Sequence, residues 1–385
     1  MAFSNRTRWM TEPNRLARTL AALRKKGIPF LDLTDSNPTR QGFKYLESGI
    51  LNPFSDSKNL LYDPDPHGLP RTRKAICDYY KTKGISLEPG QIFLTASTSE
   101  AYSFIFRLLA DPGDLILAPQ PSYPLLDYLT DLNDLEVGRY ALRYDGAWSI
   151  DVGSMQALLK KRPKAVLFVH PNNPTGNYVH EEEKKNLLKF MPPETALLAD
   201  EVFLDFAFEP KATRVPSFTE NSSHLTFTLA GISKILGLPQ MKLSWIVVSG
   251  PESLKIQAIE RLNIISDTFL SASTPVQNAL PRWFEMRPLI QKEILGRVQS
   301  NYRSLQETLR SAQTIKLLSQ EGGWNAVMEF PSLKSDEDWA LFLLEKRRLN
   351  LHPGYLFDFP QGSFLIASLL IPPETFQKAA SILTQ

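Results

Sequence analysis

The chain has 385 residues, with 43 lysines and arginines against 41 aspartates and glutamates, and a formal net charge of +2. This near balance argues against a nucleic-acid-binding protein, which needs concentrated positive charge, and the 43% hydrophobic and 22% charged fractions exclude a disordered chain. The single cysteine, Cys77, and five histidines without metal-ligand spacing predict neither a disulfide framework nor a metal site.

The N-terminal segment is not expected to form a domain of its own. Residues 1–15 lack the apolar stretch of a secretory signal, and no apolar run approaches the roughly 20 residues that span a bilayer. We therefore expect a cytoplasmic protein with no membrane segment. Residues 1–45 are too few for a separate core and are expected to pack against the C-terminal part of the chain.

The middle of the chain alternates short apolar runs with stretches of helical period. The apolar runs predict strands at residues 91–95, 115–118, 165–169, 195–199, 225–229 and 245–248. The intervening stretches predict helices at residues 99–109, 125–129, 181–190 and 252–265. Several runs are apolar throughout, as strands buried on both faces are. The alternation predicts an α/β fold, with a mostly parallel central sheet wrapped by helices, in a large domain over residues 46–280.

The C-terminal part has a different pattern. A long helix is predicted from about residue 281 to 312, followed by a strand at 325–330 and a helix at 336–347. A strand at 364–369 and a last helix at 373–383 complete the chain. This order predicts a second, smaller α+β domain over residues 281–385.

Polar side chains follow four of the predicted strands directly. They are the hydroxyl-rich segment 97–100, the turn at 171–176, Asp200 and Lys234. Because ligands of open α/β sheets bind beyond the carboxyl ends of the strands, we expect these groups at one edge of the sheet. Hydroxyls at a helix start, an amide, a carboxylate and a lysine suit a phosphorylated, cationic heterocycle that is attached covalently.

Each of these features, taken alone, also has a purely structural explanation. Ser97 with Glu100 fits a helix capping box, and Asp200 could cap a helix. The segment Asn173–Gly176 is a turn sequence. Lys234 could be an ordinary surface residue, because most lysines are exposed. The weight of the functional interpretation comes from their order and position together.

In that order and spacing the chain resembles the class I and II aminotransferases, the fold-type I enzymes that depend on pyridoxal 5′-phosphate (PLP). The resemblance extends from about residue 34 to about residue 370. Its most specific parts are Asn-Pro-Thr-Gly at 173–176, Asp-Glu at 200–201 and Ser-Lys at 233–234. It implies ping-pong transfer of an amino group between a small-molecule amine donor, such as an amino acid, and a keto-acid acceptor.

The resemblance implies a role for each matched residue. Lys234 would form a Schiff base with PLP and then act as general acid and base, and Asp200 would keep the pyridine nitrogen protonated. Tyr123 would stack on the pyridine ring, and Asn173 would donate to its O3′ oxygen. The phosphate would be held by Ser97, Thr98, Ser99 and Lys242.

The resemblance also implies a homodimer with shared sites. Tyr62 and Ser273 match residues that reach the cofactor of the partner subunit. In the N-terminal segment, Ser36 and Asn37 are expected to contact the substrate. No nucleic acid or membrane partner is implied.

Four positions depart from the family pattern. Phe203 replaces a tyrosine whose hydroxyl would donate to O3′, so we expect a raised pKa of the Schiff base. Gly231 replaces a serine and Lys242 an arginine, both ligands of the phosphate in the family. Ile366 stands where the family has the arginine that binds the α-carboxylate of the substrate.

Ile366 leaves three explanations open. Another cation, for which Arg40 and Arg261 are candidates, binds the carboxylate, or the substrate has no α-carboxylate. Alternatively, the protein binds PLP with little turnover and has a regulatory role. A PLP-dependent β-lyase or decarboxylase is the alternative within the same fold, because Lys234 and Asp200 would serve those reactions too.

Overall fold

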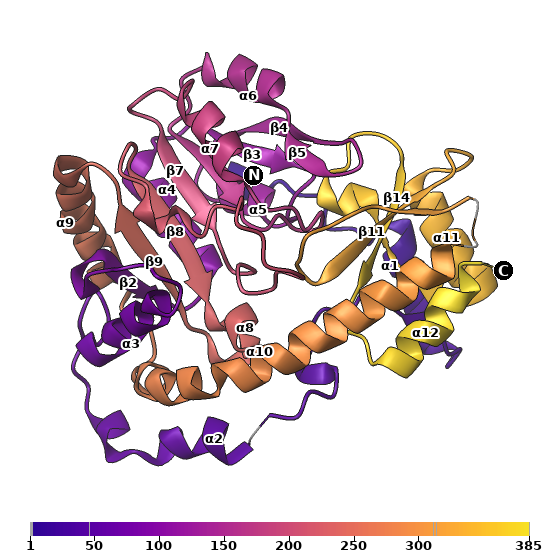
Figure 1. Cartoon of the computed structure of the whole chain (residues 1–385), viewed down its shortest axis with the longest axis horizontal. Coiled ribbons are helices and arrows are strands. Elements are labelled where there is room, and N and C mark those ends of the chain that lie inside the picture. Colours follow the sequence, from indigo (N-terminus) through magenta and orange to yellow (C-terminus); the bar gives the residue numbers. More distant parts are fainter. Residues whose placement is uncertain (1–2, 46, 311, 313, 385) are drawn as a thin grey trace.

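A computed structural model describes residues 3–45, 47–310, 312 and 314–384. Within these residues the chain forms one eight-stranded sheet, one four-stranded sheet and a two-stranded pair, all surrounded by helices (Figure 1). The predicted α/β class is confirmed. Among the described residues no helix is long and apolar enough to cross a membrane.

The large sheet carries the predicted strands of the middle of the chain. Its strands are β2 (Ile92–Thr95), β3 (Leu115–Gln120), β4 (Glu136–Tyr144), β5 (Trp148–Ile150), β6 (Ala165–Val169), β7 (Ala196–Asp200), β8 (Thr226–Gly231) and β9 (Ser244–Ser249). They lie in the order β2-β9-β8-β7-β6-β3-β4-β5. β9 runs antiparallel to both neighbours, so β2 points the same way as β6, β7 and β8. The carboxyl ends of these four strands therefore meet at one edge.

The central strands β6, β7, β8 and β9 are buried at every position because both faces of the sheet are covered, and β6 is apolar throughout. In β7, Leu198 packs in the cluster that contains α4 (Thr98–Leu109) and α9 (Glu252–Phe269). Its neighbour Leu197 points to the other face, where it packs with α6 (Val152–Leu159) and α7 (Glu181–Leu188). Burial on both faces removes the polar alternation of a half-exposed strand.

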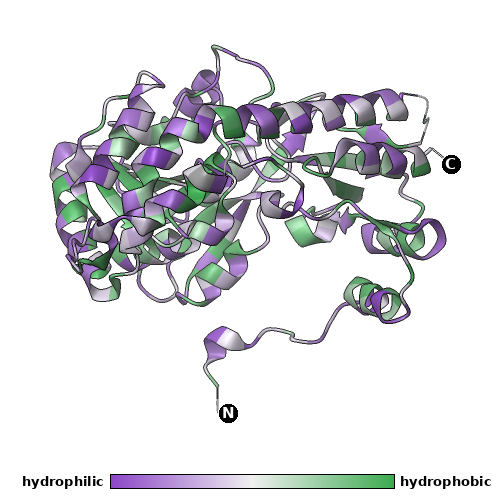
Figure 2. Cartoon of the chain, turned by 90° about the horizontal axis from the view of Figure 1, so that it is seen from below, coloured by the Kyte–Doolittle hydropathy of each residue, from purple (hydrophilic) through white to green (hydrophobic). Residues whose placement is uncertain are grey.

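The smaller sheet lies in the C-terminal part, in the order β10-β11-β14-β13. The remaining elements are α1 (Arg15–Lys25), β1 (Leu31–Asp32), α2 (Glu47–Leu51), α3 (Pro70–Lys81), α5 (Leu126–Asp131), α8 (Ile232–Ile235), β10 (Lys316–Leu317), β11 (Asn325–Phe330), α11 (Asp336–Arg347), β12 (Leu349–Asn350), β13 (His352–Pro353), β14 (Ser363–Ser368) and α12 (Pro373–Ile382). In Figure 2 the N-terminal segment extends away from the rest of the chain, and β1 then pairs with β12.

The long helix α10 (Thr274–Leu309) runs from the large sheet toward the smaller one (Figure 1). It begins seven residues before the predicted start at residue 281, so that boundary was wrong, and Pro281 and Pro288 lie inside it. Because proline is common in the first turn of a helix, the start expected from the sequence falls at Pro281, although this residue lies inside the helix. The predicted division into segments 1–45, 46–280 and 281–385 stays a prediction, and its second boundary falls within α10.

Candidate active site

A pocket of about 100 Å³ opens at the edge where the four carboxyl ends meet. It is lined by six of the residues predicted from the sequence, namely Thr98, Tyr123, Asn173, Asp200, Phe203 and Lys234. Val202, Gly231 and Ser244 contribute to the same lining. The sheet topology therefore brings together predicted side chains that lie as far as 136 residues apart in the chain, from Thr98 to Lys234.

Lys234 lies on α8, one short helical turn that follows β8 directly. Its Nζ atom is 5.3 Å from the ring centre of Phe203 and 5.1 Å from that of Trp324. Burial against these rings lowers the pKa of Lys234 to about 8, although the negative charge of Asp200 acts in the opposite direction. A substantial fraction of the side chain is therefore neutral near pH 8, as a nucleophilic amine needs to be.

Asp200 is the last residue of β7 and is buried. Its Oδ2 atom accepts a hydrogen bond of 2.8 Å from the hydroxyl of Tyr102, and Oδ1 accepts one of 3.2 Å from the backbone amide of Val202. Burial raises the pKa of Asp200, whereas these two hydrogen bonds and the charge of Lys234 lower it. A carboxylate accepts about four hydrogen bonds, so Asp200 retains capacity for a cationic donor.

Asn173 is oriented from the smaller sheet. Nδ2 of Asn325, the first residue of β11, donates to Oδ1 of Asn173 at 2.7 Å. The structure records no acceptor for Nδ2 of Asn173 among the described residues, so that donor faces the pocket unpaired. Ser36 donates to Oδ1 of Asn325 at 3.4 Å and is thereby connected to the pocket.

The start of α4 combines a cap with free donors. Ser97 Oγ accepts from the Glu100 amide at 3.1 Å, and Glu100 Oε2 accepts from the Ala96 amide at 2.8 Å. This reciprocal capping leaves the backbone amides of Thr98 and Ser99 without an acceptor among the described residues. The capping and phosphate-binding interpretations are therefore compatible, because free amides and the helix dipole favour an anion here.

Seven of the predicted site residues lie outside this pocket lining. Ser36, Ser97 and Ser99 are connected to it as described above, and the other four are more distant from the lining groups. Lys242 is exposed, with a left-handed backbone at φ 53°. Tyr62 is 74% exposed and lines a neighbouring pocket with Ala272 and Thr274, which flank Ser273. Asn37 caps a short 3-10 helix through the amide of Thr39. The roles of Lys242, Tyr62, Ser273 and Asn37 stay predictions.

The pocket offers no second cation for a substrate carboxylate among the residues that the structure describes in its lining. Ile366 is fully buried on β14 in an apolar cluster that includes Val327 and Phe357. Arg40 is exposed beside Asp35, and Arg261 donates to a carbonyl of its own helix α9. Neither arginine lines the pocket.

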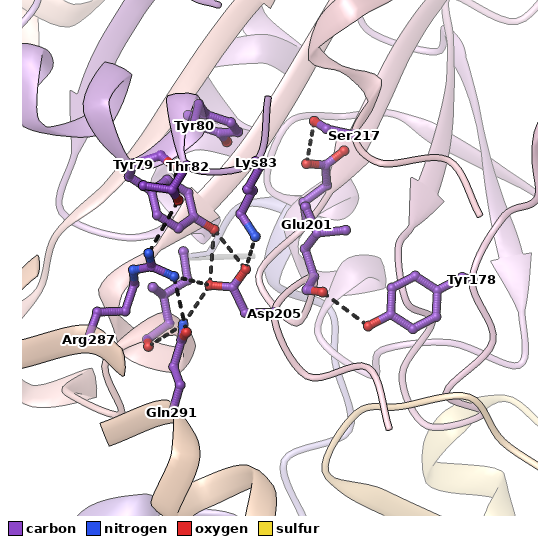
Figure 3. Close-up of polar contacts among 12 residues, drawn as sticks. Tyr79, Tyr80, Thr82, Lys83, Tyr178, Glu201, Asp205, Ser217, Arg287 and Gln291 are labelled. Atoms are coloured by element: carbon purple, nitrogen blue, oxygen red, sulfur yellow. Dashed lines mark hydrogen bonds and ion pairs between the residues drawn. The ribbon is translucent and has the colours of Figure 1, made fainter. Parts of the chain in front are cut away.

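The segment that follows Asp200 is anchored on both sides (Figure 3). Glu201 accepts from the Phe218 amide at 2.7 Å and from the Ser217 hydroxyl at 2.8 Å, and burial raises the pKa of Glu201 to about 7. Farther along, the Asp205 carboxylate receives the side chains of Tyr79, Lys83, Arg287 and Gln291, which come from α3, the residues after it and α10. These contacts anchor Glu201 and Asp205, which lie on either side of the pocket residues Val202 and Phe203.

The lining groups fit PLP. The amine of Lys234 matches its aldehyde, the under-bonded carboxylate of Asp200 matches a protonated ring nitrogen, and the free amide of Asn173 matches a phenolic oxygen. The open helix start at Thr98 matches a phosphate. Tyr102, Trp324, Asn325 and Ser244 take part in or support this site and were not predicted as site residues.

Comparisons with known proteins agree with this fit. The family described as aminotransferase class I and II matches residues 40–383. The chain is 25% identical over 353 residues to the glutamate-pyruvate aminotransferase of Haemophilus influenzae, covering 88% of this chain and 85% of that protein. It is 30% identical over 244 residues to an S-alkyl-thiohydroximate lyase of Arabidopsis thaliana, covering 62% of this chain and 52% of that protein.

The fold is similar to that of solved aminotransferases. Alanine aminotransferase from Pyrococcus furiosus superimposes with a TM-score of 0.88 at 22% identity, over 99% of this chain and 98% of that one. The family match covers most of the chain and includes every pocket residue named above. The chain therefore belongs to the class I and II aminotransferases and is a transaminase that depends on pyridoxal 5′-phosphate.

Proposed function

We propose that the protein transfers amino groups between an amino acid and a 2-oxo acid, with Lys234 and Asp200 as its catalytic residues. The observation that carries the proposal is the meeting of an amine of lowered pKa and a buried, under-bonded carboxylate in one pocket. Perturbed titratable groups that converge in a pocket are typical of catalytic sites.

When bound, PLP supplies an aldehyde for the amine and a protonated ring that stores the electron pair released at the substrate carbon. Lys234 would hold the cofactor through Nζ, and the same amine would take up and return the proton at the substrate carbon. Asp200 holds the proton on the ring nitrogen through its carboxylate, and the hydroxyl of Tyr102 keeps that carboxylate in place.

The other lining residues orient the cofactor. Tyr123, partly buried at the pocket wall, would stack on the ring, and Asn173 would donate from Nδ2 to the ring oxygen. The amides at Thr98 and Ser99 bind the phosphate. Phe203 and Trp324 keep water from Nζ of Lys234 and so maintain its lowered pKa.

The proposal includes a homodimer with shared sites. Leu60, Leu61 and Tyr62 are 89%, 65% and 74% exposed, which is a large apolar surface for an isolated chain. This surface adjoins the residues around Ser273, and Ser271 in turn donates to Glu100 at the start of α4. A partner covering it would bring its own Tyr62 segment close to the phosphate end of the pocket. The cytoplasmic location belongs to the same proposal.

A β-lyase is the second candidate. One relative is named as an S-alkyl-thiohydroximate lyase, and the apolar cluster around Ile366 offers no cation for a carboxylate among the described residues. The two reactions differ in their nitrogen product, because a lyase releases ammonia whereas a transaminase passes nitrogen to an acceptor.

The test uses 15N-labelled amino acids, singly and as a panel, with pyruvate or 2-oxoglutarate as acceptor. We expect 15N in the acceptor-derived amino acid, no free ammonia, and loss of transfer in Lys234→Ala. Release of labelled ammonia with an unlabelled acceptor would establish the lyase instead. Transfer from simple amines but not from amino acids would contradict an amino acid as donor.

A further inference from the structure

Ser244 lies in the large sheet beside the pocket, and none of the roles assigned so far involves it. It is the first residue of β9, and its direct neighbours are Thr95 on β2 and Gly231 on β8. Directly opposite residues of antiparallel strands place their side chains on the same face. Two residues separate Thr95 from the start of α4, and Gly231 precedes α8 directly, so Ser244 lies between the two helix starts that border the pocket.

The hydroxyl of Ser244 has no partner of its own. The residue is only 2% exposed, and it lines the same pocket as Thr98 and Lys234. The structure records no hydrogen bond from its Oγ atom to any described residue. Because the residue is almost fully buried and borders the pocket, its unpaired hydroxyl can bond only to what enters the pocket, so a polar group of a ligand is expected beside it.

Gly231 explains why this hydroxyl can occupy its place. A Cβ atom added at Gly231 would collide with Oγ of Ser244 and would stand 3.0 Å from its Cβ and 3.2 Å from the carbonyl oxygen of Leu243. The backbone of Gly231 is extended, with φ −174°, so conformation alone would permit any side chain. The space between β8 and β9 accepts a side chain at position 231 or at position 244, but not at both.

We infer that Ser244 is a phosphate ligand of the bound cofactor, with its hydroxyl completing a cradle formed by the free amides of Thr98 and Ser99. Two independent observations meet here: an open helix start and the unpaired hydroxyl of a buried residue in the same pocket. A phosphate monoester accepts from both kinds of donor. The inference rests on the proposed function, since the phosphate is that of PLP.

The first test separates the phosphate from the rest of the cofactor. PLP and pyridoxal, which lacks the phosphate, are titrated into the apoprotein, and both dissociation constants are read from tryptophan fluorescence. Ser244→Ala is expected to weaken PLP binding at least about tenfold, the loss of one hydrogen bond to a charged group, and to leave pyridoxal binding unchanged. The melting temperature of the apoprotein is measured in parallel to exclude a folding defect.

Ser249→Ala is the matched control. Ser249 ends the same strand, is 5% exposed, and its hydroxyl is also buried without a partner, but it does not line the pocket. This variant is expected to bind PLP and pyridoxal as the wild type does. An equal loss of PLP affinity in Ser249→Ala would show a general effect of strand β9 and would overturn the inference.

A second test moves the hydroxyl from position 244 on β9 to position 231 on the neighbouring strand β8. Gly231→Ser alone should lower both the melting temperature and PLP affinity, because its side chain meets Ser244. The double variant Gly231→Ser with Ser244→Gly removes the two contacts with the Ser244 side chain, leaves the contact of 3.2 Å with the Leu243 carbonyl oxygen, and supplies a hydroxyl from β8. It is expected to recover most of the wild-type preference for PLP over pyridoxal, which a purely structural role of Ser244 would not produce.

The outcomes also separate this inference from the proposed function. If the wild type binds PLP covalently and Ser244→Ala keeps the wild-type ratio of PLP to pyridoxal affinity, only the role of Ser244 is overturned. If the wild type takes up no PLP at Lys234, as judged by borohydride reduction and peptide mass, both are contradicted.

Discussion

Two aspartates five residues apart, Asp200 and Asp205, illustrate how the chain treats a structural and a functional carboxylate. Both are removed from water, with residue Asp200 8% exposed and the Asp205 side chain 3% exposed. Asp205 is surrounded by side-chain donors and cations of α3, the residues after it and α10 (Figure 3). From the part of the chain that the structure describes, Asp200 receives one hydroxyl and one backbone amide.

The difference indicates where a ligand is needed. A buried carboxylate that lacks a paired cation is unfavourable, and a chain retains one only where another benefit compensates. Lys83 and Arg287 supply the positive charges beside Asp205, whereas the cationic ring of the cofactor would supply the one beside Asp200. The following predictions test whether Asp205 contributes mainly to stability and Asp200 mainly to catalysis.

The largest effect is expected for Asp200→Ala. Without the carboxylate the ring nitrogen no longer stays protonated, and amino transfer should fall by about three orders of magnitude. Stability should remain within about 1 kcal/mol of the wild type, because an under-bonded buried carboxylate is lost. Steady-state transfer rates and urea unfolding measure the two effects, and a strongly destabilised variant with normal turnover would reverse the assignment.

Asp205→Ala should show the opposite profile. It leaves the ammonium of Lys83 and the guanidinium of Arg287 without their carboxylate, and both side chains are largely buried. We expect a loss of about 3 kcal/mol in the free energy of unfolding, measured in urea. Any change in turnover at a temperature where the variant is folded should stay small, and a selective loss of turnover would contradict a structural role.

Tyr102→Phe should produce an intermediate effect on the pH dependence. The hydroxyl of Tyr102 stabilises the ionised form of Asp200 and so lowers its pKa. Its removal raises the pKa of Asp200, so the carboxylate becomes protonated at a higher pH than in the wild type. The acidic limb of the rate profile should move up by about one pH unit.

Tyr140→Phe provides the control for this change. The Tyr140 hydroxyl is equally buried, but it donates to the carbonyl oxygen of Leu167 and does not touch Asp200. Its acidic limb should coincide with that of the wild type. A shift of the same size in both variants would assign the effect to lost packing.

The smallest effect is expected for Phe203→Tyr. Phe203 lines the pocket, and its lack of a hydroxyl leaves the ring oxygen of the cofactor with one donor fewer. Adding the hydroxyl should lower, by less than about one unit, the pKa that governs the visible absorption band of the bound cofactor. A spectrophotometric titration identical to that of the wild type would show that the added donor does not reach the cofactor.

The sequence predicted the site best where its residues directly follow a fully buried strand. Asp200 ends the apolar run of β7, Lys234 lies three residues beyond the fully buried strand β8, and parallel topology places such strand ends together. β4 escaped prediction because it lies near the edge of the sheet, where half-exposed positions interrupt the apolar pattern.

The supporting residues could not be predicted from local patterns. Tyr102 occurs in an apolar helix segment, where an aromatic residue indicates only core packing. Trp324 and Asn325 come from the other sheet, and nothing near them in the sequence points to Lys234 or Asn173. The place of Ser244 depends on its strand register, which the single sequence did not provide.

The central claim is that the cofactor is attached to Lys234, and reduction with borohydride followed by peptide mass analysis tests it most directly. The protein is loaded with PLP, reduced and digested, beside Lys234→Ala treated identically. We predict a reduced cofactor adduct on the peptide that contains Lys234 and its absence from the variant. An adduct on another lysine, or an unchanged visible band in Lys234→Ala, would contradict the account.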